Sequence, residues 1–228
     1  MKWIKHLPNA LTLGNLICGC FGIVFCFENR AVPIAYFVWA AGLFDFFDGF
    51  AARWLKATSP IGKELDSLAD MVSFGLLPSL LMYKMISASS TIPYLPYLAF
   101  LISACSALRL AIFNVDETQR DSFKGLNTPA NAIFITSLPF ISGATGSFIQ
   151  HDWVLVSITI IFSLLLVSRV RILAFKFKDF SWQHNKLRFT FLASAVLLTV
   201  IFHQQAVPLI ILMYIVFSLV GNALKREG

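Results

Sequence analysis

Long apolar stretches recur along the whole chain, and they constrain its fold more than any other feature. A helix that crosses a bilayer needs about 20 mainly apolar residues. Only 13% of the 228 residues are charged, roughly half the share of an average soluble domain, and the mean hydropathy is +0.75. The sequence therefore predicts an all-α polytopic membrane helix bundle, a single integral membrane domain with about eight transmembrane helices, centred on 9–27, 32–54, 62–85, 92–113, 128–149, 153–174, 187–203 and 206–223.

The distribution of positive charge predicts how these helices are oriented. Lys and Arg are enriched in loops that stay in the cytoplasm. With the N-terminus inside, all but Arg30 and Lys84 of the 18 Lys and Arg residues fall at cytoplasmic ends or loops. We therefore expect an integral protein of a prokaryotic cell (inner) membrane, with both termini and the active site facing the cytoplasm. The net charge of +6 fits contact with anionic membrane lipids better than nucleic-acid binding, because the basic residues lie between apolar runs.

Four aspartates stand out, because carboxylates are costly in or near a bilayer. Asp45 and Asp48 are three residues apart in the second apolar stretch, and Asp66 and Asp70 are four apart in the third. Each pair therefore shares one face of its helix. The short connection 56–60 makes the two helices antiparallel neighbours, so both pairs converge near their cytoplasmic ends. Converging carboxylates repel one another unless a divalent cation binds them, and oxygen ligands without nearby His or Cys suit Mg²⁺, Mn²⁺ or Ca²⁺ rather than zinc.

Small residues and an arginine accompany these carboxylates. Gly49 and Ala52 lie one turn apart on the second predicted helix, and Gly62 opens the third. Such residues let a flat ligand approach the backbone closely. Arg53 follows Ala52 directly, and its guanidinium matches the geometry of a phosphate group. Metal ligands, an arginine and a groove of small residues together indicate a site for a nucleotide diphosphate.

The complete pattern over residues 45–70, D-x-x-D-G-x-x-A-R-x(8)-G-x-x-x-D-x-x-x-D, resembles the signature of the CDP-alcohol phosphatidyltransferases at every fixed position. The resemblance implies a six-helix catalytic core over residues 1–175, followed by two additional C-terminal helices over 176–228. It also implies a homodimer.

The resemblance further implies the roles of individual residues. Three carboxylates, Asp45, Asp48 and Asp66, would hold the divalent metal ion, and Asp70 would either join them as a ligand or act as the catalytic general base. For Thr12 and Asn15, two polar residues of the first apolar run, an interpretation other than CDP contact stays open, namely hydrogen bonds to backbone carbonyls between helices. The residues that the resemblance and the small-residue groove place against the CDP moiety are Thr12, Asn15, Gly49, Ala52, Arg53, Gly62 and Asp66.

Other segments indicate the alcohol that accepts the phosphatidyl group. They are similar to the corresponding segments of the phosphatidylserine synthases in this family. The similarity implies that the phosphatidyl group of CDP-diacylglycerol passes to the hydroxyl of L-serine, giving phosphatidylserine and CMP. The segments are 8–15, 68–75, 106–114, 123–130 and 167–169.

The zwitterionic serine needs a cation for its carboxylate, and an arginine within a membrane segment is a functional candidate by default. Two alternatives stay open for the candidates named below. The basic residues could serve only to orient the protein in the membrane, and Asn114 could cap a helix. Two positions depart from the family pattern, because Ile112 stands where Arg is expected, and Asn127 or Thr128 where Pro is expected. We expect serine to be bound by Arg109, Asn114, Lys124 and Arg169, with Arg171 as a further option.

Two other functions stay open on the sequence. The first is the same transfer to another alcohol, such as glycerol-3-phosphate or an inositol phosphate, whose own phosphate needs a denser cationic pocket. The second is a cation transporter with a carboxylate site. Transporter sites usually lie near the midplane on broken helices, often within inverted repeats. The aspartates of this chain lie toward one face, and the sequence shows no repeat, which favours the enzyme.

Overall fold

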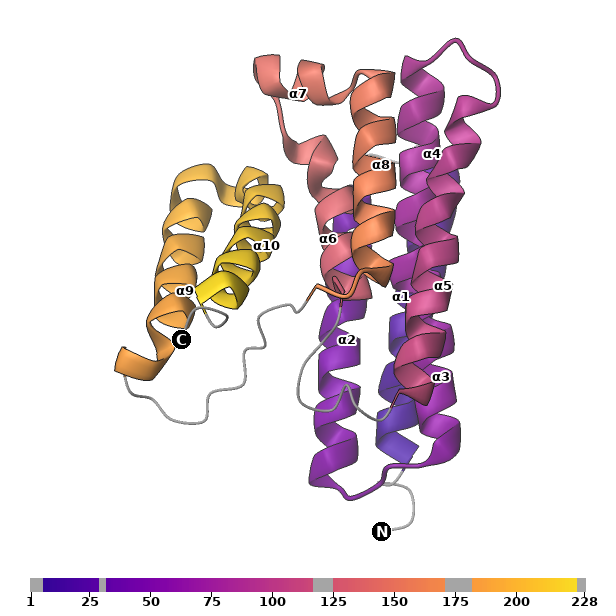
Figure 1. Ribbon diagram of the computed structural model, residues 1–228. Helices are drawn as coiled ribbons and strands as arrows, with labels where there is room; N and C mark the ends of the chain where they lie inside the picture. The colour runs from indigo at the N-terminus through magenta and orange to yellow at the C-terminus, as the bar shows by residue number, and fades with distance from the viewer. Residues whose placement is uncertain (1–5, 29–31, 117–124, 171–181, 225–228) are drawn as a thin grey trace.

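The computed structural model describes residues 6–28, 32–116, 125–170 and 182–224. Within these ranges the chain is helical without strands, which confirms the predicted all-α class. Figure 1 shows a tall bundle with a separate hairpin of two helices at its side. The helices are α1 (Leu7–Glu28), α2 (Ile34–Trp54), α3 (Pro60–Asp70), η2 (Met71–Leu76), α4 (Leu77–Ser89), η3 (Leu95–Ala99), α5 (Phe100–Val115), α6 (Thr128–Ser137), η5 (Leu138–Phe140), α7 (Gly143–Ile149), α8 (Asp152–Val167), α9 (Trp182–Phe202), η6 (His203–Gln205) and α10 (Ala206–Leu224).

Most of the described chain belongs to helices that are long and apolar enough to cross a membrane. Residues Arg188–Gly221 cover most of α9 and α10, which turn back at η6 and lie side by side as the hairpin of Figure 1. The bent pair of α7 and α8 adds one further span if it is counted as a unit. The chain is therefore an integral membrane protein with several spans. The five stretches found in the described ranges are Leu7–Glu28, Ile34–Trp54, Pro60–Ser89, Leu95–Val115 and Arg188–Gly221, the last of which includes the turn at η6.

The stretch that carries Asp66 and Asp70 changes its winding in the middle. Ser59 caps its start by accepting a hydrogen bond from the backbone N–H of Gly62 at 3.0 Å, and Pro60 occupies the first turn, where an N–H is not needed. Directly after Asp70 the α-helix becomes the π-helix η2, and α4 then continues it. Single π-turns inside longer helices are frequent at functional sites.

Glycines let α1 lie close against this stretch. A Cβ on Gly19 would lie 3.0 Å from the Cα of Ser73, tighter than nine in ten real contacts, and closer still to the Ser73 Oγ. One turn later, a Cβ on Gly22 would lie 2.5 Å from a methyl carbon of Leu77. Small residues permit such close approach between membrane helices. The polar side chains of α1 are therefore brought onto the helix that carries two of the four aspartates.

The fifth predicted span, 128–149, is not one straight helix, so this prediction was wrong in its details. The helix α6 stops at Ser137, η5 follows, and α7 begins only at Gly143. Pro139 has no backbone N–H to continue the ladder, and Gly143 adopts a φ of +71°, which favours glycine. The short α7 then meets α8 at 72°. As a result, α6 is a short helix whose residues are nearly all buried inside the bundle.

Two residues fix the point at which α6 begins. Gly125 has a φ of +78°, and a Cβ there would lie 2.5 Å from the carbonyl oxygen of Leu166, so a side chain has no room. Asn127 then caps α6, because its side-chain oxygen accepts a hydrogen bond from the N–H of Ala130 at 2.8 Å. The cap stands at one of the two positions where the family resemblance predicts proline. The first turns of α6 are thereby held against the end of α8.

A large apolar core surrounds α6. Phe134 of α6 stacks on Phe162 of α8, with ring centroids 4.0 Å apart. From the hairpin, Phe191, Tyr214 and Ile215 are buried in the same cluster. The hairpin is thus packed onto the bundle through α6, rather than attached only by the chain.

Candidate active site

The four aspartates lie on α2 and α3, the two helices that the connection after Trp54 joins, and Asp70 is the last residue of α3. Asp45, Asp48 and Asp66 each offer a carboxylate oxygen, and these three oxygens lie within 4.8 Å of one another. Asp70 follows one turn after Asp66 and is only 7% exposed. The two pairs converge as the sequence predicted, because spacings of three and four residues keep side chains on one face of a regular helix.

The three clustered carboxylates fit a divalent cation. Asp48 is buried, and Oδ1 of Asp66 is buried without a hydrogen-bond partner among the described residues. Like charges at this separation repel strongly in a partly buried site, and a buried acceptor without a partner costs free energy. A cation that prefers hard oxygen ligands, such as Mg²⁺ or Mn²⁺, removes both penalties. Within the described ranges, this group contains no His or Cys.

Helix α1 supplies partners for two of these carboxylates. The Thr12 hydroxyl lies 2.6 Å from Oδ2 of Asp48 and 3.0 Å from the carbonyl oxygen of Pro8, so the shorter contact is the one to the carboxylate. The Asn15 amide N–H donates to Oδ1 of Asp70 at 2.9 Å. Thr12 and Asn15 are three residues apart on one face of α1. Partners of this kind orient metal ligands and general bases, a role that the sequence did not reveal because it depends on tertiary contacts.

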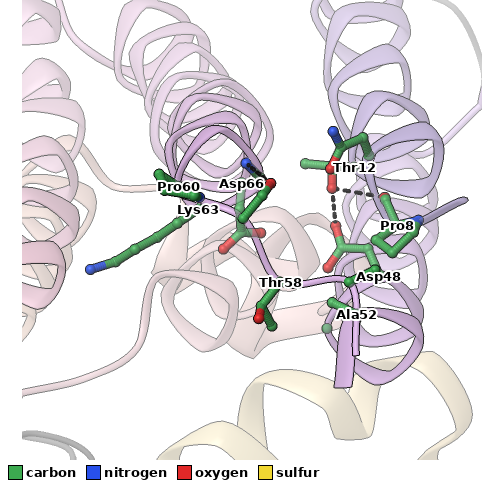
Figure 2. Close-up of a pocket in the computed structure, with 13 residues that line it drawn as sticks. Pro8, Thr12, Asp48, Ala52, Thr58, Pro60, Lys63 and Asp66 are labelled. Carbon is green, nitrogen blue, oxygen red and sulfur yellow. Dashed lines mark hydrogen bonds between the residues drawn. The ribbon is translucent and has the colours of Figure 1, made fainter. Parts of the chain in front are cut away.

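A cavity of about 520 Å³ opens beside Asp48 and Asp66. Figure 2 shows Thr12 and Asp48 on one side of it and Asp66 on the other, with Thr58 on the connection between α2 and α3. Its volume is in the range of small-molecule sites, about 300–1,000 Å³. Five of the seven residues expected to contact CDP line the cavity, namely Thr12, Gly49, Ala52, Gly62 and Asp66.

The small residues leave room in this cavity. A Cβ on Gly49 would have only Nη2 of Arg53 within reach, at 4.0 Å, so the guanidinium of Arg53 extends over that glycine. Arg53 itself is exposed and does not line the cavity. Asn15, the other expected CDP contact, lies deeper and bonds Asp70. A side chain at Gly62 would press on Ser59 Oγ at 3.1 Å.

Lys63 is a cation of this region that the sequence did not indicate as a site residue. It lines the cavity, and Figure 2 shows its side chain extending away from Asp48. Its Nζ donates to the carbonyl oxygen of Asn114 at 2.6 Å. The amide N–H of Asn114 in turn donates to Ser67 Oγ at 2.8 Å. Asn114 therefore links the end of α5 to α3, and neither a bound serine nor a helix cap is needed to explain its contacts.

Of the other residues expected to bind serine, the structure describes Arg109 and Arg169, and these two differ in burial. Arg109 is buried in α5, with 7% of its surface exposed. Tyr214 of α10 lies within electrostatic range of its guanidinium. Arg169 follows the end of α8 and is exposed. Lys124 and Arg171 lie outside the described residues. Arg109 is thus the one described basic residue of this set that is enclosed within the protein.

Two buried polar residues, one of them on the helix of Arg109, were not singled out from the sequence. Ser106 lies one turn before Arg109, is fully buried and has no partner for its hydroxyl among the described residues. Asn131 in α6 is also fully buried, and neither of its amide atoms has a partner in the described part of the chain. In the sequence, the available signal for Ser106 and Asn131 was a polar residue within an apolar helix. That signal indicates a functional residue only once the structure shows that the side chain lacks a partner among the described residues.

Comparison with known proteins matches the sequence model of the CDP-alcohol phosphatidyltransferases to residues 5–165, from α1 almost to the end of α8. The chain is similar to the CDP-diacylglycerol–serine O-phosphatidyltransferase of Bacillus subtilis, with 34% identity over 76% of this chain and 93% of that protein. The enzyme of the same name from Mycobacterium leprae is 31% identical over 73% of this chain and 58% of its own length.

An archaeal protein belongs to the same set of relatives. The archaetidylserine synthase of Methanothermobacter thermautotrophicus is 33% identical over 63% of each chain. The family match covers the helices that carry the four aspartates, and it covers more than half of the chain. The chain therefore belongs to the CDP-alcohol phosphatidyltransferase family.

Proposed function

We propose that this protein transfers the phosphatidyl group of CDP-diacylglycerol to the hydroxyl of L-serine, giving phosphatidylserine and CMP. The observation that carries the proposal is the group of three carboxylates at the wall of a cavity lined by small residues. The serine specificity is supported by the names of the bacterial relatives and of the archaeal one, which also names serine.

The donor site is the cavity. Asp45, Asp48 and Asp66 would hold a divalent cation, which would neutralise charge at the diphosphate and at the leaving CMP. Gly49 and Ala52 let the nucleotide approach the backbone of α2. The exposed guanidinium of Arg53 extends over Gly49, where it can pair with a phosphate in a forked geometry.

Asp70 is the proposed general base. The serine hydroxyl oxygen forms a bond to the phosphorus that carries diacylglycerol, the bond from that phosphorus to the CMP oxygen breaks, and the hydroxyl proton passes to Asp70. The hydrogen bond from Asn15 holds one oxygen of Asp70, which fixes the direction of the other. Arg109 provides the buried cation for the serine carboxylate.

The proposed location is a prokaryotic cell membrane with the cavity facing the cytoplasm. Positive charge gathers at the end of the bundle where α2 meets α3. Lys84, one of the two charges expected outside, lies on α4 and donates a hydrogen bond to the carbonyl of Cys26 near the opposite end of α1. Arg30 lies outside the described residues. The homodimer stays a prediction of the family resemblance.

The proposal is tested by an assay of the purified protein with CDP-diacylglycerol, Mn²⁺ or Mg²⁺, and a panel of labelled alcohols. We expect a lipid product with serine, and none with glycerol-3-phosphate or inositol phosphate. A product with one of those phosphates but not with serine would refute the acceptor and retain the donor chemistry. Metal-coupled flux into liposomes without any lipid product would instead identify a transporter.

A further inference from the structure

Asn131 has a polar side chain that no residue in the described part of the chain satisfies. It lies in the first half of α6, is fully buried, and both its amide oxygen and its amide nitrogen lack a partner among the described residues. A primary amide can make several hydrogen bonds, and leaving all of them unmade in an apolar interior is costly. Buried groups of this kind are rare and call for an explanation such as a ligand or an ordered water.

The surroundings of Asn131 connect it with the proposed active site. The neighbouring residue, Ala132, packs against Phe74 and Leu77, so this part of α6 lies on the π-helix η2 and the start of α4. Asp70 directly precedes η2. Asn131 therefore lies on a helix that packs against the helical stretch directly following the proposed general base.

Helix α5 brings a second unsatisfied group to the same turn. Ser106 lies against Gly75 of η2, because a Cβ on that glycine would come within 3.2 Å of the Ser106 Cβ. The Ser106 hydroxyl is fully buried without a partner in the described chain. Arg109 is one turn further along the same face of α5. Two unsatisfied neutral groups and one enclosed cation thus lie on the helices that contact η2.

We propose that Asn131, Ser106 and Arg109 form the subsite that binds the ammonium and carboxylate groups of the acceptor amino acid beside Asp70. The proposal rests on the proposed function. Arg109 pairs with the carboxylate, and the amide of Asn131 and the hydroxyl of Ser106 supply the acceptors that an ammonium group requires. A phosphorylated alcohol would meet only the guanidinium of Arg109 in this subsite. A single cation suits the carboxylate of a zwitterion better than the larger negative charge of a phosphate.

The test replaces each neutral group by an apolar one of similar size. Asn131→Leu and Ser106→Ala are compared with Ser137→Ala, whose hydroxyl is on α6, fully buried and likewise without a partner among the described residues. Ser137 lies roughly 9 Å further along the helix than Asn131. The measurements are KM for serine, KM for CDP-diacylglycerol, and the rise in melting temperature that CDP-diacylglycerol with Mg²⁺ causes in detergent.

We expect Asn131→Leu to raise KM for serine about 10-fold to 100-fold, the loss typical of a hydrogen bond to a charged group. Ser106→Ala should raise it less, and Ser137→Ala should leave it unchanged. The stabilisation by CDP-diacylglycerol should be that of the wild type in all three variants, since the donor site is intact.

An unchanged serine KM in both Asn131→Leu and Ser106→Ala, while wild-type activity is intact, would overturn the subsite alone. A lower melting temperature in Asn131→Leu would then identify the amide as a structural group paired with water. If the wild type makes no phosphatidylserine at all, the proposed function fails first and the subsite falls with it. Should Asn131→Leu fail to fold, the comparison of Ser106→Ala with Ser137→Ala still tests the subsite, because only Ser106→Ala is expected to raise KM for serine.

Discussion

At the scale of single residues, the four aspartates divide into a group of three and a separate fourth. Asp45, Asp48 and Asp66 share a space that one cation can occupy, whereas Asp70 is held by Asn15. Replacing a carboxylate by the isosteric amide removes the charge and leaves the shape. The two kinds of aspartate should therefore give different results when metal binding and turnover are measured separately.

We predict that Asp48→Asn weakens Mn²⁺ binding by at least about 10-fold. We predict that Asp70→Asn retains Mn²⁺ binding but lowers turnover by about 10²–10⁴-fold, which is the contribution of a general base. Mn²⁺ binding is measured by electron paramagnetic resonance, and turnover by CMP release. Asp152→Asn is the control, because Asp152 lies in the first turn of α8, far from the cluster in the chain. Loss of Mn²⁺ binding in Asp70→Asn would make Asp70 a metal ligand instead.

The hydrogen bond from Thr12 to Asp48 gives a second prediction at this scale. Thr12→Val keeps the shape and removes the 2.6 Å contact. We expect Mn²⁺ affinity to fall about 10-fold to 100-fold, as for other partners of metal ligands. Thr136→Val is the matched control, because the hydroxyl of Thr136 is buried and bonds only the carbonyl of Ala132 in its own helix. Equal Mn²⁺ affinity in the two variants would show that Thr12 does not orient the ligand.

At the scale of helices, the position of α1 decides whether those hydrogen bonds can form. Even Gly19→Ala places a Cβ against the backbone of Ser73. Overpacking of this kind costs about 1–3 kcal/mol, or roughly 3–10 °C in melting temperature for a chain of this size. We therefore expect Gly19→Ala to lower the melting temperature in detergent and to weaken Mn²⁺ binding, because Thr12 and Asn15 are displaced with α1.

Gly42→Ala is the control for this change. A Cβ on Gly42 has nothing within 4 Å, and alanine is the better helix former. The melting temperature of Gly42→Ala should stay level or rise slightly, with normal Mn²⁺ affinity. If both glycine variants behave alike, close packing of α1 on η2 is not what holds the site together.

Helix-level comparison also shows what the sequence could and could not predict. The apolar runs and the Asp spacings predicted the membrane helices and the convergence of Asp45, Asp48 and Asp66, because both follow from local periodicity. The break after α6 was missed, because apolar content outweighed Pro139 in the prediction of that span. Neither the π-turn η2 nor the partners of Thr12 and Asn15 could be predicted, since they depend on which helices touch.

At the scale of the whole molecule, the C-terminal hairpin is the part that the family match does not include. The match ends at residue 165, and the hairpin begins at Trp182. Nevertheless, Tyr214 and Ile215 are buried in the same cluster as Phe134 of α6. The hairpin therefore closes one side of the core around α6, the helix that carries Asn131.

This packing predicts that the hairpin contributes to the stability of the bundle. Ile215 is 9% exposed, whereas the next residue, Val216, is 54% exposed. Truncating a buried isoleucine to alanine costs about 2–5 kcal/mol through lost contacts and the remaining cavity. We expect Ile215→Ala to lower the melting temperature in detergent clearly, and Val216→Ala on the same helix to leave it nearly unchanged. Serine KM should rise only in Ile215→Ala, because loosened contacts let α6 shift. Equal melting temperatures for the two variants would mean that the hairpin is an independent appendage, and the acceptor site would then have to be complete within the matched core.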